Sequence, residues 1–159
     1  MKKLVLAFSG GLDTSYCTKS LSKQGFEVHA VGINTGGFDA IEIESLHKKA
    51  LILGAKSYTC IDAVETFYKD IVKYLVFGNV LKNNTYPLSV SAERITQAVT
   101  LINHAKKIGA SYIAHGSTGA GNDQVRFDLV FQTLAPEVEI ITPIRDQKLS
   151  REEEIKYLK

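Results

Sequence analysis

Phe8-Ser9-Gly10-Gly11-Leu12-Asp13-Thr14-Ser15 is the stretch that decides the fold of this chain. An apolar run, residues 4–8, leads directly into it. Apolar residues then recur at helical spacing, among them Tyr16, Cys17 and Leu21. The stretch therefore predicts a strand, a tight glycine turn and a helix in direct succession.

The same turn predicts a binding site for a phosphate-like anion. The paired glycines Gly10 and Gly11 let the backbone approach a ligand closely and turn N–H groups toward it. The helix that begins there adds the positive end of its dipole. Three hydroxyls complete the set: Ser9, Thr14 and Ser15. The alternative is a glycine turn, capped by Asp13 or Thr14, that binds nothing. No G-x-x-x-x-G-K-[ST] motif occurs in the sequence, so no lysine is placed as in the P-loop.

Strand and helix patterns alternate along the whole chain. Strands are expected at residues 4–8, 26–34, 57–62, 111–115 and 138–142. Helices are expected from residue 12 to 24, around residues 43–53, over 64–75, over 91–108 and around 127–134. Three helices end on a glycine shortly before a strand: Gly25, Gly54 and Gly109. This order predicts an α/β fold, a doubly wound parallel five-stranded sheet with helices on both faces.

In such a sheet, ligands bind at the carboxyl ends of the strands. Three loops are therefore expected to converge on one crevice: residues 9–15, 34–37 and 116–123. Residues 78–87, rich in asparagine, are expected to form a polar loop.

Composition narrows the class of protein. The chain has 159 residues, enough for one domain, with 45% hydrophobic and 23% charged residues. A net charge of +2 is too small to indicate nucleic acid or a membrane surface as a partner. No apolar run reaches the roughly 20 residues of a membrane span. Cys17 and Cys60 lie in apolar patterns, which predicts buried free thiols and a cytoplasmic location. The histidines lack ligand spacing, so no metal site is expected, and His115 is expected to be structural.

A second informative stretch runs from Ala114 to Asp128, with the sequence AHGSTGAGNDQVRFD. Asp123 occupies an expected N-cap position, and Arg126 follows on the first helical turn. A guanidinium there can bind a substrate carboxylate through two hydrogen bonds. The alternative is that Asn122 and Asp123 only cap the helix. A weaker stretch, residues 86–91, places a tyrosine and two serines before a helix, with Ser91 as its expected N-cap.

The two stronger stretches carry a resemblance. Residues 7–15 and 115–128 are similar to the two signatures of the argininosuccinate synthase family, whose N-terminal nucleotide-binding part covers essentially all of this chain. The resemblance implies an adenine nucleotide α-hydrolase-like fold related to the Rossmann fold. It also implies that ATP, as its Mg²⁺ complex, joins citrulline to aspartate through a citrullyl-adenylate, releasing AMP and pyrophosphate. Family enzymes are longer and form homotetramers.

The domain organisation follows from this comparison. Residues 1–149 are expected to form the nucleotide-binding domain. Ser150 and Glu153 form a capping box, so residues 150–159 are expected to start a connecting helix. The chain is therefore expected to be a fragment that lacks a C-terminal synthetase domain.

The resemblance also implies roles for individual residues. Catalysis is assigned to Asp13 and Ser15, with Asp13 also expected to cap the helix. ATP contacts are assigned to Ala7, Phe8, Ser9, Gly10, Gly11, Leu12, Asp13, Thr14, Ser15, Ile33 and Gly116. Citrulline contacts are assigned to Tyr86, Ser91, Asn122 and Arg126. Contacts to the substrate aspartate are assigned to Thr118, Asn122 and Asp123. The sequence departs from the usual family pattern at Thr35, Gly37, Glu93, Ile95 and Ala120.

The residues by themselves leave two other functions open. One is a different ATP pyrophosphatase, such as a tRNA-thiolating or tRNA-lysidine-forming enzyme, which would be expected to carry a basic surface or catalytic cysteines. The other is a non-catalytic ATP-binding sensor of the universal-stress type, which would bind ATP and ignore citrulline and aspartate.

Overall fold

A computed structural model describes residues 2–159, with the side chains of Lys82 and Pro87 left out of the description. Its main strands are β1 (Lys2–Ala7), β2 (Phe26–Asn34), β3 (Ser57–Asp62), β6 (Tyr112–Ala114) and β7 (Glu139–Ile141). Its longer helices are α1 (Leu12–Lys23), α2 (Ala40–Ile52), α5 (Ser89–Ile108), α6 (Asp123–Leu134) and α8 (Arg151–Leu158). The strand–turn–helix unit predicted around residues 8–15 is confirmed.

The five main strands form one parallel sheet in the order β3-β2-β1-β6-β7. Leu4 of β1 aligns with Val28 of β2 on one side and with Tyr112 of β6 on the other. The order reverses direction at β1, so the turn that follows β1 lies at the switch point where parallel sheets bind ligands. The predicted fold class is confirmed.

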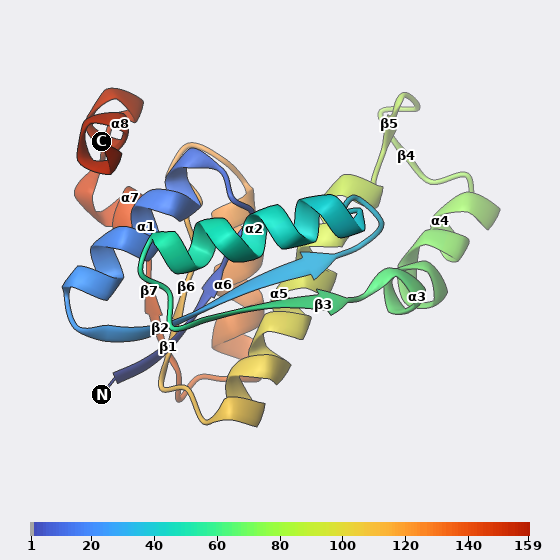
Figure 1. The fold of residues 1–159 in the computed structure, drawn as a ribbon. Helices are drawn as coiled ribbons and strands as arrows, with labels where there is room; N and C mark the ends of the chain where they lie inside the picture. The colour runs from blue at the N-terminus through green and yellow to red at the C-terminus, as the bar shows by residue number, and fades with distance from the viewer. Residues whose placement is uncertain (1) are drawn as a thin grey trace.

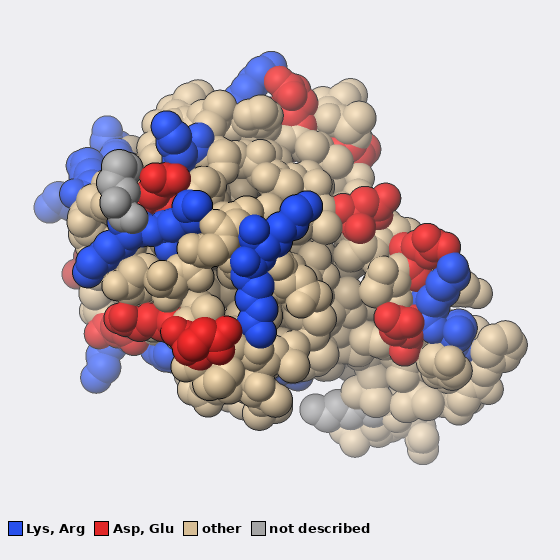
Figure 2. Space-filling model, turned by 90° about the horizontal axis from the view of Figure 1, so that it is seen from below, with Lys and Arg blue, Asp and Glu red and all other residues tan. Residues whose placement is uncertain are grey.

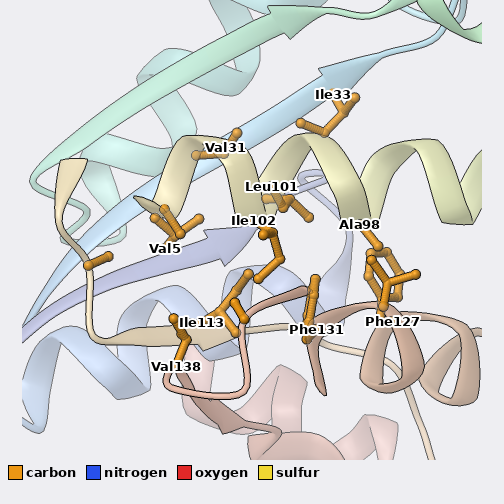
Figure 3. Packing of buried hydrophobic residues seen from close by; sticks show 14 of the residues in the cluster. Val5, Val31, Ile33, Ala98, Leu101, Ile102, Ile113, Phe127, Phe131 and Val138 are labelled. Atoms are coloured by element: carbon orange, nitrogen blue, oxygen red, sulfur yellow. The ribbon is translucent and has the colours of Figure 1, made fainter. Parts of the chain in front are cut away.

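Helices cover both faces of the sheet (Figure 1). On one face, α5 and α6 pack against Val5, Val31 and Ile113 (Figure 3). On the other face, α1, α2 and the short helix α7 (Pro143–Gln147) pack against Leu4, Leu6 and their neighbours. Alternate residues of β1 thus enter opposite layers, which explains why the strand is apolar throughout.

Glycine ends three helices as the sequence predicts. Gly25, Gly54 and Gly109 have φ values of +88°, +98° and +66°. A side chain disfavours this left-handed region, and glycine enters it without penalty. Each of these turns returns the chain to the sheet within a few residues.

The region between β3 and α5 differs from the prediction. The single helix expected over residues 64–75 is divided into three pieces: α3 (Val64–Phe67), a π-helical turn (Tyr68–Val72) and α4 (Lys73–Phe77). The expected polar loop contains a small hairpin of β4 (Leu81–Lys82) and β5 (Tyr86–Pro87). Asn83 and Asn84 turn it with φ values of +55° and +57°, a conformation that asparagine tolerates better than most residues. Figure 1 shows this region projecting beyond the sheet.

Other boundaries also shift. Helix α5 begins at Ser89, with Leu88 at its N-cap, so the prediction that Ser91 caps this helix is wrong. Helix α7 has no counterpart among the expected helices; Pro143 stands in its first turn, a position where the missing N–H costs little. Helix α8 begins with the predicted capping box at Ser150 and Glu153 and packs against α1.

The surface mixes charges of both signs. In Figure 2, Lys and Arg side chains lie interspersed with Asp and Glu side chains over the face that is shown. None of the helices within residues 2–159 is long and apolar enough to cross a membrane.

Candidate functional site

A cavity of about 740 Å³ opens at the carboxyl ends of the central strands. It is lined from the ends of β1 and β2, from α5 and from the loop before α6, so the predicted convergence of three loops is confirmed. This volume is within the range of small-molecule sites. Its floor is apolar, with Val31, Ile33, Leu101 and Phe127. Its rim is polar. The floor therefore offers a surface for a flat apolar group, and the rim offers a surface for charged groups.

The phosphate loop, residues 9–15, forms one wall. Gly10 has φ +74°, and a Cβ atom there would lie 2.2 Å from Cδ2 of Leu46. The hydroxyl of Ser15 donates to the carbonyl oxygen of Gly11 at 2.7 Å, and that of Thr14 donates to the same oxygen at 3.3 Å. These short-range bonds hold the turn against the first residues of α1.

The start of α1 is left without a capping side chain. Gly11 occupies the N-cap position, and no side chain in the described part of the chain accepts a capping hydrogen bond there. The expected cap by Asp13 is therefore wrong, and so is the alternative of a cap by Thr14, because both residues lie inside the helix, where they line the cavity. Uncapped N–H groups and a positive dipole end make this helix start a suitable anion site.

Gly116 lets the loop after β6 approach the phosphate loop. A Cβ atom on Gly116 would lie 3.2 Å from the carbonyl carbon of Asp13 and 3.3 Å from Cγ2 of Thr14. Such distances are tighter than about nine in ten real contacts of a Cβ atom, so the neighbouring atoms would have to move. Because Gly116 has no side chain, residues 115–118 can lie at the cavity wall beside Asp13.

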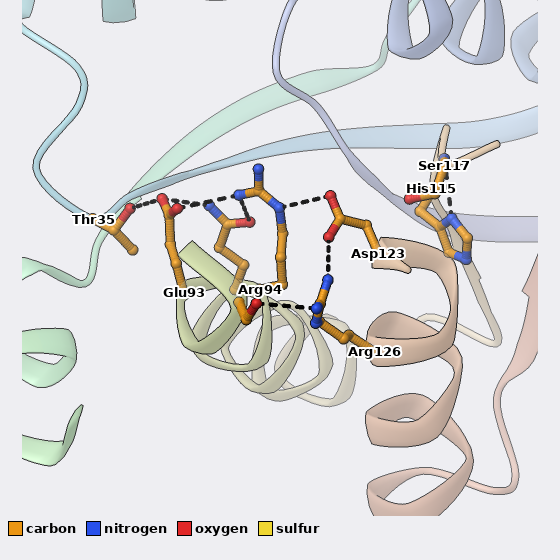
Figure 4. Close-up of polar contacts among 9 residues, drawn as sticks. Thr35, Glu93, Arg94, His115, Ser117, Asp123 and Arg126 are labelled. Carbon is orange, nitrogen blue, oxygen red and sulfur yellow. Dashed lines mark hydrogen bonds and ion pairs between the residues drawn. The ribbon is translucent and has the colours of Figure 1, made fainter. Parts of the chain in front are cut away.

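The opposite side is a charged wall, defined as Thr35, Ser91, Glu93, Arg94, Gln97, Asp123 and Arg126 (Figure 4). Thr35 donates to Glu93 at 2.5 Å, and Glu93 also accepts from Gln97 at 3.2 Å and from Arg94 at 3.3 Å. Nε of Arg94 then reaches Asp123 at 3.1 Å. The wall thereby connects the end of β2 to α6 across α5.

Asp123 is the centre of this wall. Its second carboxylate oxygen accepts from Arg126 at 2.8 Å, and Arg126 also donates to the hydroxyl of Ser91 at 3.0 Å. The prediction that Asp123 caps α6 is wrong, because Asn122 holds the N-cap position and Asp123 is the first helical residue. Its carboxylate is turned instead toward two guanidinium groups.

His115 lies in the wall of the cavity and is almost entirely buried, with 1% of its surface exposed. Its Nδ1 accepts from the backbone N–H of Ser117 at 3.2 Å, so the proton sits on Nε2, which donates to Asp128 at 3.0 Å. Burial lowers the pKa of His115, and the carboxylate of Asp128 only partly opposes this. Asp128 is also held by Arg145. This arrangement agrees with the structural role predicted for His115.

The structure brings together most of the predicted ligand-binding residues. Those that line the cavity are Ala7, Phe8, Ser9, Gly11, Leu12, Asp13, Thr14, Ile33, Gly116, Thr118 and Asp123. Ser91 and Arg126 lie directly behind Asp123 through the hydrogen bonds given above. Four others do not line the cavity: Gly10, Ser15, Tyr86 and Asn122. Tyr86 lies on the projecting hairpin and is 47% exposed.

Sequence reasoning missed several cavity residues. Gln97 and Arg94 reach the cavity from one turn of α5, and Arg151 reaches it from α8. A local pattern could have placed Arg94 and Gln97 on one helix face, since they are three residues apart. The contribution of Arg151 depends on how α8 docks on α1, which no local pattern gives.

The cysteines differ from each other. Cys17 is fully buried and free, as predicted, and burial, with the nearby carboxyls of Glu154 and Asp13, raises its pKa to about 12. Cys60 is free but only half-buried, so the prediction of a buried thiol is wrong in degree. Burial raises the pKa of Cys60 as well. Among the described residues, no group of three or more His, Cys, Asp or Glu side chains could hold a metal ion.

Comparison with protein families matches residues 3–159 to the arginosuccinate synthase N-terminal HUP domain. The chain is 44% identical over 156 residues to argininosuccinate synthase of Rubrobacter xylanophilus and 45% identical over 156 residues to that of Lactococcus lactis subsp. lactis. Each alignment covers 98% of this chain and 38% or 39% of the relative. The chain therefore spans well under half the length of these relatives.

Solved structures show the same fold. A 4-thiouridine synthetase in complex with RNA and bound ATP superposes with a TM-score of 0.73 at 15% identity, covering 99% of this chain and 40% of that one. A predicted subunit of a tRNA methyltransferase from Methanocaldococcus jannaschii superposes with a TM-score of 0.66 at 18% identity, covering 99% and 74%. At such identities the likeness concerns the fold alone.

Proposed function

The chain belongs to the argininosuccinate synthase family, and we propose that it is the ATP-binding part of a ligase that joins citrulline to aspartate. One observation carries this proposal. The phosphate loop and the charged wall face each other across a single cavity, so an anionic nucleotide and zwitterionic amino acids have complementary surfaces within reach of one another.

The nucleotide is proposed to lie along the apolar floor with its phosphates at the phosphate loop. Ile33 and Phe127 offer an apolar surface for a purine base, and Gly116 leaves room for the sugar or α-phosphate beside Asp13. The N–H groups at the start of α1 would accept the negative charge of the phosphates. Mg²⁺ would arrive with ATP as its complex and neutralise part of the phosphate charge, and the carboxylate of Asp13 is the acidic group of the phosphate loop that could bind it.

The proposed reaction has two steps. The ureido oxygen of citrulline attacks the α-phosphorus of ATP, an O–P bond forms, and the bond to pyrophosphate breaks. The amine of aspartate then attacks the ureido carbon, loses a proton and displaces AMP. No side chain is required as a nucleophile in either step. The contribution of the protein would be positioning and stabilisation of charge on pyrophosphate.

The charged wall is the proposed site of the two amino acids. A substrate carboxylate would bind the guanidinium of Arg126, which is 28% exposed, and would compete with Asp123 for it. The carboxylate of Asp123 would in turn accept the ammonium group of the substrate aspartate, beside the hydroxyl of Thr118. Both partners are prearranged by their mutual ion pair, which limits the reorganisation that binding requires.

Two observations weigh against the alternative functions. A tRNA-thiolating enzyme requires a reactive thiolate, whereas Cys17 is buried with its pKa raised to about 12. An ATP sensor needs no charged wall opposite the phosphate loop. Neither alternative accounts for the interlinked Arg94, Asp123 and Arg126.

Calorimetric titration of the 159-residue chain tests the proposal. MgATP is added first, then citrulline, then aspartate, with AMP in place of ATP as a control. Binding of ATP followed by binding of citrulline is the expected result. ATP binding without any response to either amino acid would favour the sensor, and failure to bind ATP would refute an independent nucleotide site in this chain.

A further inference from the structure

Helix α8 is docked on α1 beside the phosphate loop (Figure 1). The ammonium group of Lys19 donates to the carbonyl oxygens of Tyr157 and Leu158 at 3.1 and 3.0 Å. The rings of Tyr16 and Tyr157 pack with their centroids 4.9 Å apart. The capping box at Ser150 fixes the start of α8. The other contacts fix its end, so the whole helix is held in a defined place.

The same docking buries a carboxyl group. Glu154 is 2% exposed, and its Oε2 atom has no hydrogen-bond partner within the described part of the chain. Burial raises the pKa of Glu154, and the neighbouring Asp13 raises it further, whereas Arg151 opposes both effects. The first turn of α8 therefore lies against the part of the phosphate loop that contains Asp13.

Arg151, on this first turn, lines the cavity together with Asp13 and Thr14. The other cation of the cavity lining is Arg94, which is paired with Glu93 and Asp123. Arg151 forms no ion pair with any residue of the described chain, although its side chain is at the cavity. It is thus a guanidinium available to a ligand at the phosphate end.

We propose that Arg151 is a phosphate-binding residue, which contacts the terminal phosphates of ATP and then the pyrophosphate that leaves. This inference rests on the proposed function. The phosphate loop has hydroxyls and N–H groups but no lysine or arginine between residues 8 and 15. A triphosphate carries several negative charges, and a guanidinium binds phosphate oxygens through two parallel hydrogen bonds. Lys49 donates to the carbonyl oxygen of Gly10 at 2.5 Å but does not line the cavity, so Arg151 is the cation that α8 adds on the cavity side of the loop.

The test compares Arg151→Ala with Lys156→Ala, which removes an exposed cation from the same helix away from the cavity. Binding of MgATP, inorganic pyrophosphate and AMP is measured by calorimetry, with thermal melting of each variant as a check on folding. Arg151→Ala is expected to weaken ATP and pyrophosphate binding by about tenfold or more, as loss of a charge-assisted hydrogen bond does. AMP binding and the melting temperature are expected to stay unchanged, and Arg151→Lys is expected to be intermediate.

The outcomes separate this inference from the proposed function. If the unaltered chain binds ATP and Arg151→Ala binds ATP and pyrophosphate equally well, the role of Arg151 is refuted and the proposed function stands. Equal weakening of ATP and AMP also refutes a role at the terminal phosphates. If the unaltered chain binds neither ATP nor pyrophosphate, both the inference and an independent nucleotide site in this chain are refuted.

Discussion

The two sides of the cavity are built by different means. The phosphate loop is shaped by its own backbone, with Gly10 in a left-handed conformation and hydroxyls that bond to carbonyl oxygens at most four residues away. The charged wall is shaped by side chains from the loop after β2, from α5 and from α6, which are far apart in the sequence and meet only in the folded chain. The shape of the loop is therefore fixed by local backbone bonds, whereas the wall is a set of hydrogen bonds and ion pairs that a proposed substrate would have to exchange.

This difference predicts different responses to substitution. A change in the backbone geometry of the loop should remove phosphate binding altogether. A change in one member of the wall should alter one substrate and leave ATP binding nearly intact, because the remaining side chains can re-pair. The following experiments test the contrast, from the largest expected effect to the smallest.

Gly10→Ala should have the largest effect. A side chain at φ +74° costs about 1–2 kcal/mol, and the added Cβ would also displace Leu46. We expect ATP affinity to fall by more than tenfold, that is by more than about 1.4 kcal/mol. Gly25→Ala is the matched control, since Gly25 also has positive φ but has open space around it and lies away from the cavity. The contrast is supported if both variants lose stability but only Gly10→Ala loses ATP binding. Equal ATP affinity in the two variants would contradict it.

Arg126→Ala should affect citrulline and spare ATP. The substitution removes the guanidinium that donates to Asp123 and Ser91, and we expect the affinity of the ATP-loaded protein for citrulline to fall by roughly tenfold. Calorimetry with citrulline, with and without ATP, measures the effect. An unchanged affinity for citrulline would show that Arg126 only supports Asp123.

Lower pH should destabilise the back of the site through His115. Its pKa in the folded state is lowered, so the unfolded chain binds more protons once the pH falls below about 6.5. The contribution of His115 to stability is therefore present above that pH and is lost as the pH falls toward its folded pKa, by at most about 1.4 kcal/mol per pH unit. Urea unfolding at pH 7.5 and at lower pH, compared with His115→Gln, measures it. Equal slopes in the two proteins would rule out this contribution.

Glu93→Gln should have the smallest effect. The amide can still accept from Thr35, but the wall loses one negative charge that faces the cavity. We expect ATP to bind about two- to threefold more tightly at low salt, since a partly exposed charge contributes less than about 1 kcal/mol. The gain should vanish at high salt because exposed charges are then screened. Tighter binding that persists at high salt would point to a change in shape instead.

The same contrast explains what could be predicted from the sequence. The strand–turn–helix at residues 8–15 and the helix ends at Gly25, Gly54 and Gly109 depend on neighbouring residues, and these predictions are confirmed. The roles of Asp13 and Asp123 as caps were predicted from the same local patterns and are wrong, because tertiary contacts override local capping preferences. Asp123 is drawn to Arg94, which is distant in sequence.

Side chains that act across the sheet were the hardest to predict. Thr35 and Glu93 are both departures from the family pattern, and only the structure shows that they contact each other. Arg151 enters the cavity because α8 docks on α1, a packing that leaves no periodic signal near residue 151. The substrate roles assigned to Tyr86, Ser91, Asn122 and Arg126 stay predictions.

The central place of β1 has a consequence for how the chain acquires its site. As the polypeptide is synthesised, β1 emerges first and can pair with β2 early, since Lys2 aligns with Phe26. Its other neighbour, β6, is made only when Tyr112 has been reached. Pairing of such distant segments is slow, because a long loop must close before the contact forms. Until then the phosphate loop borders an incomplete sheet, so a ribosome-bound chain in which β6 has not yet emerged should lack the complete cavity.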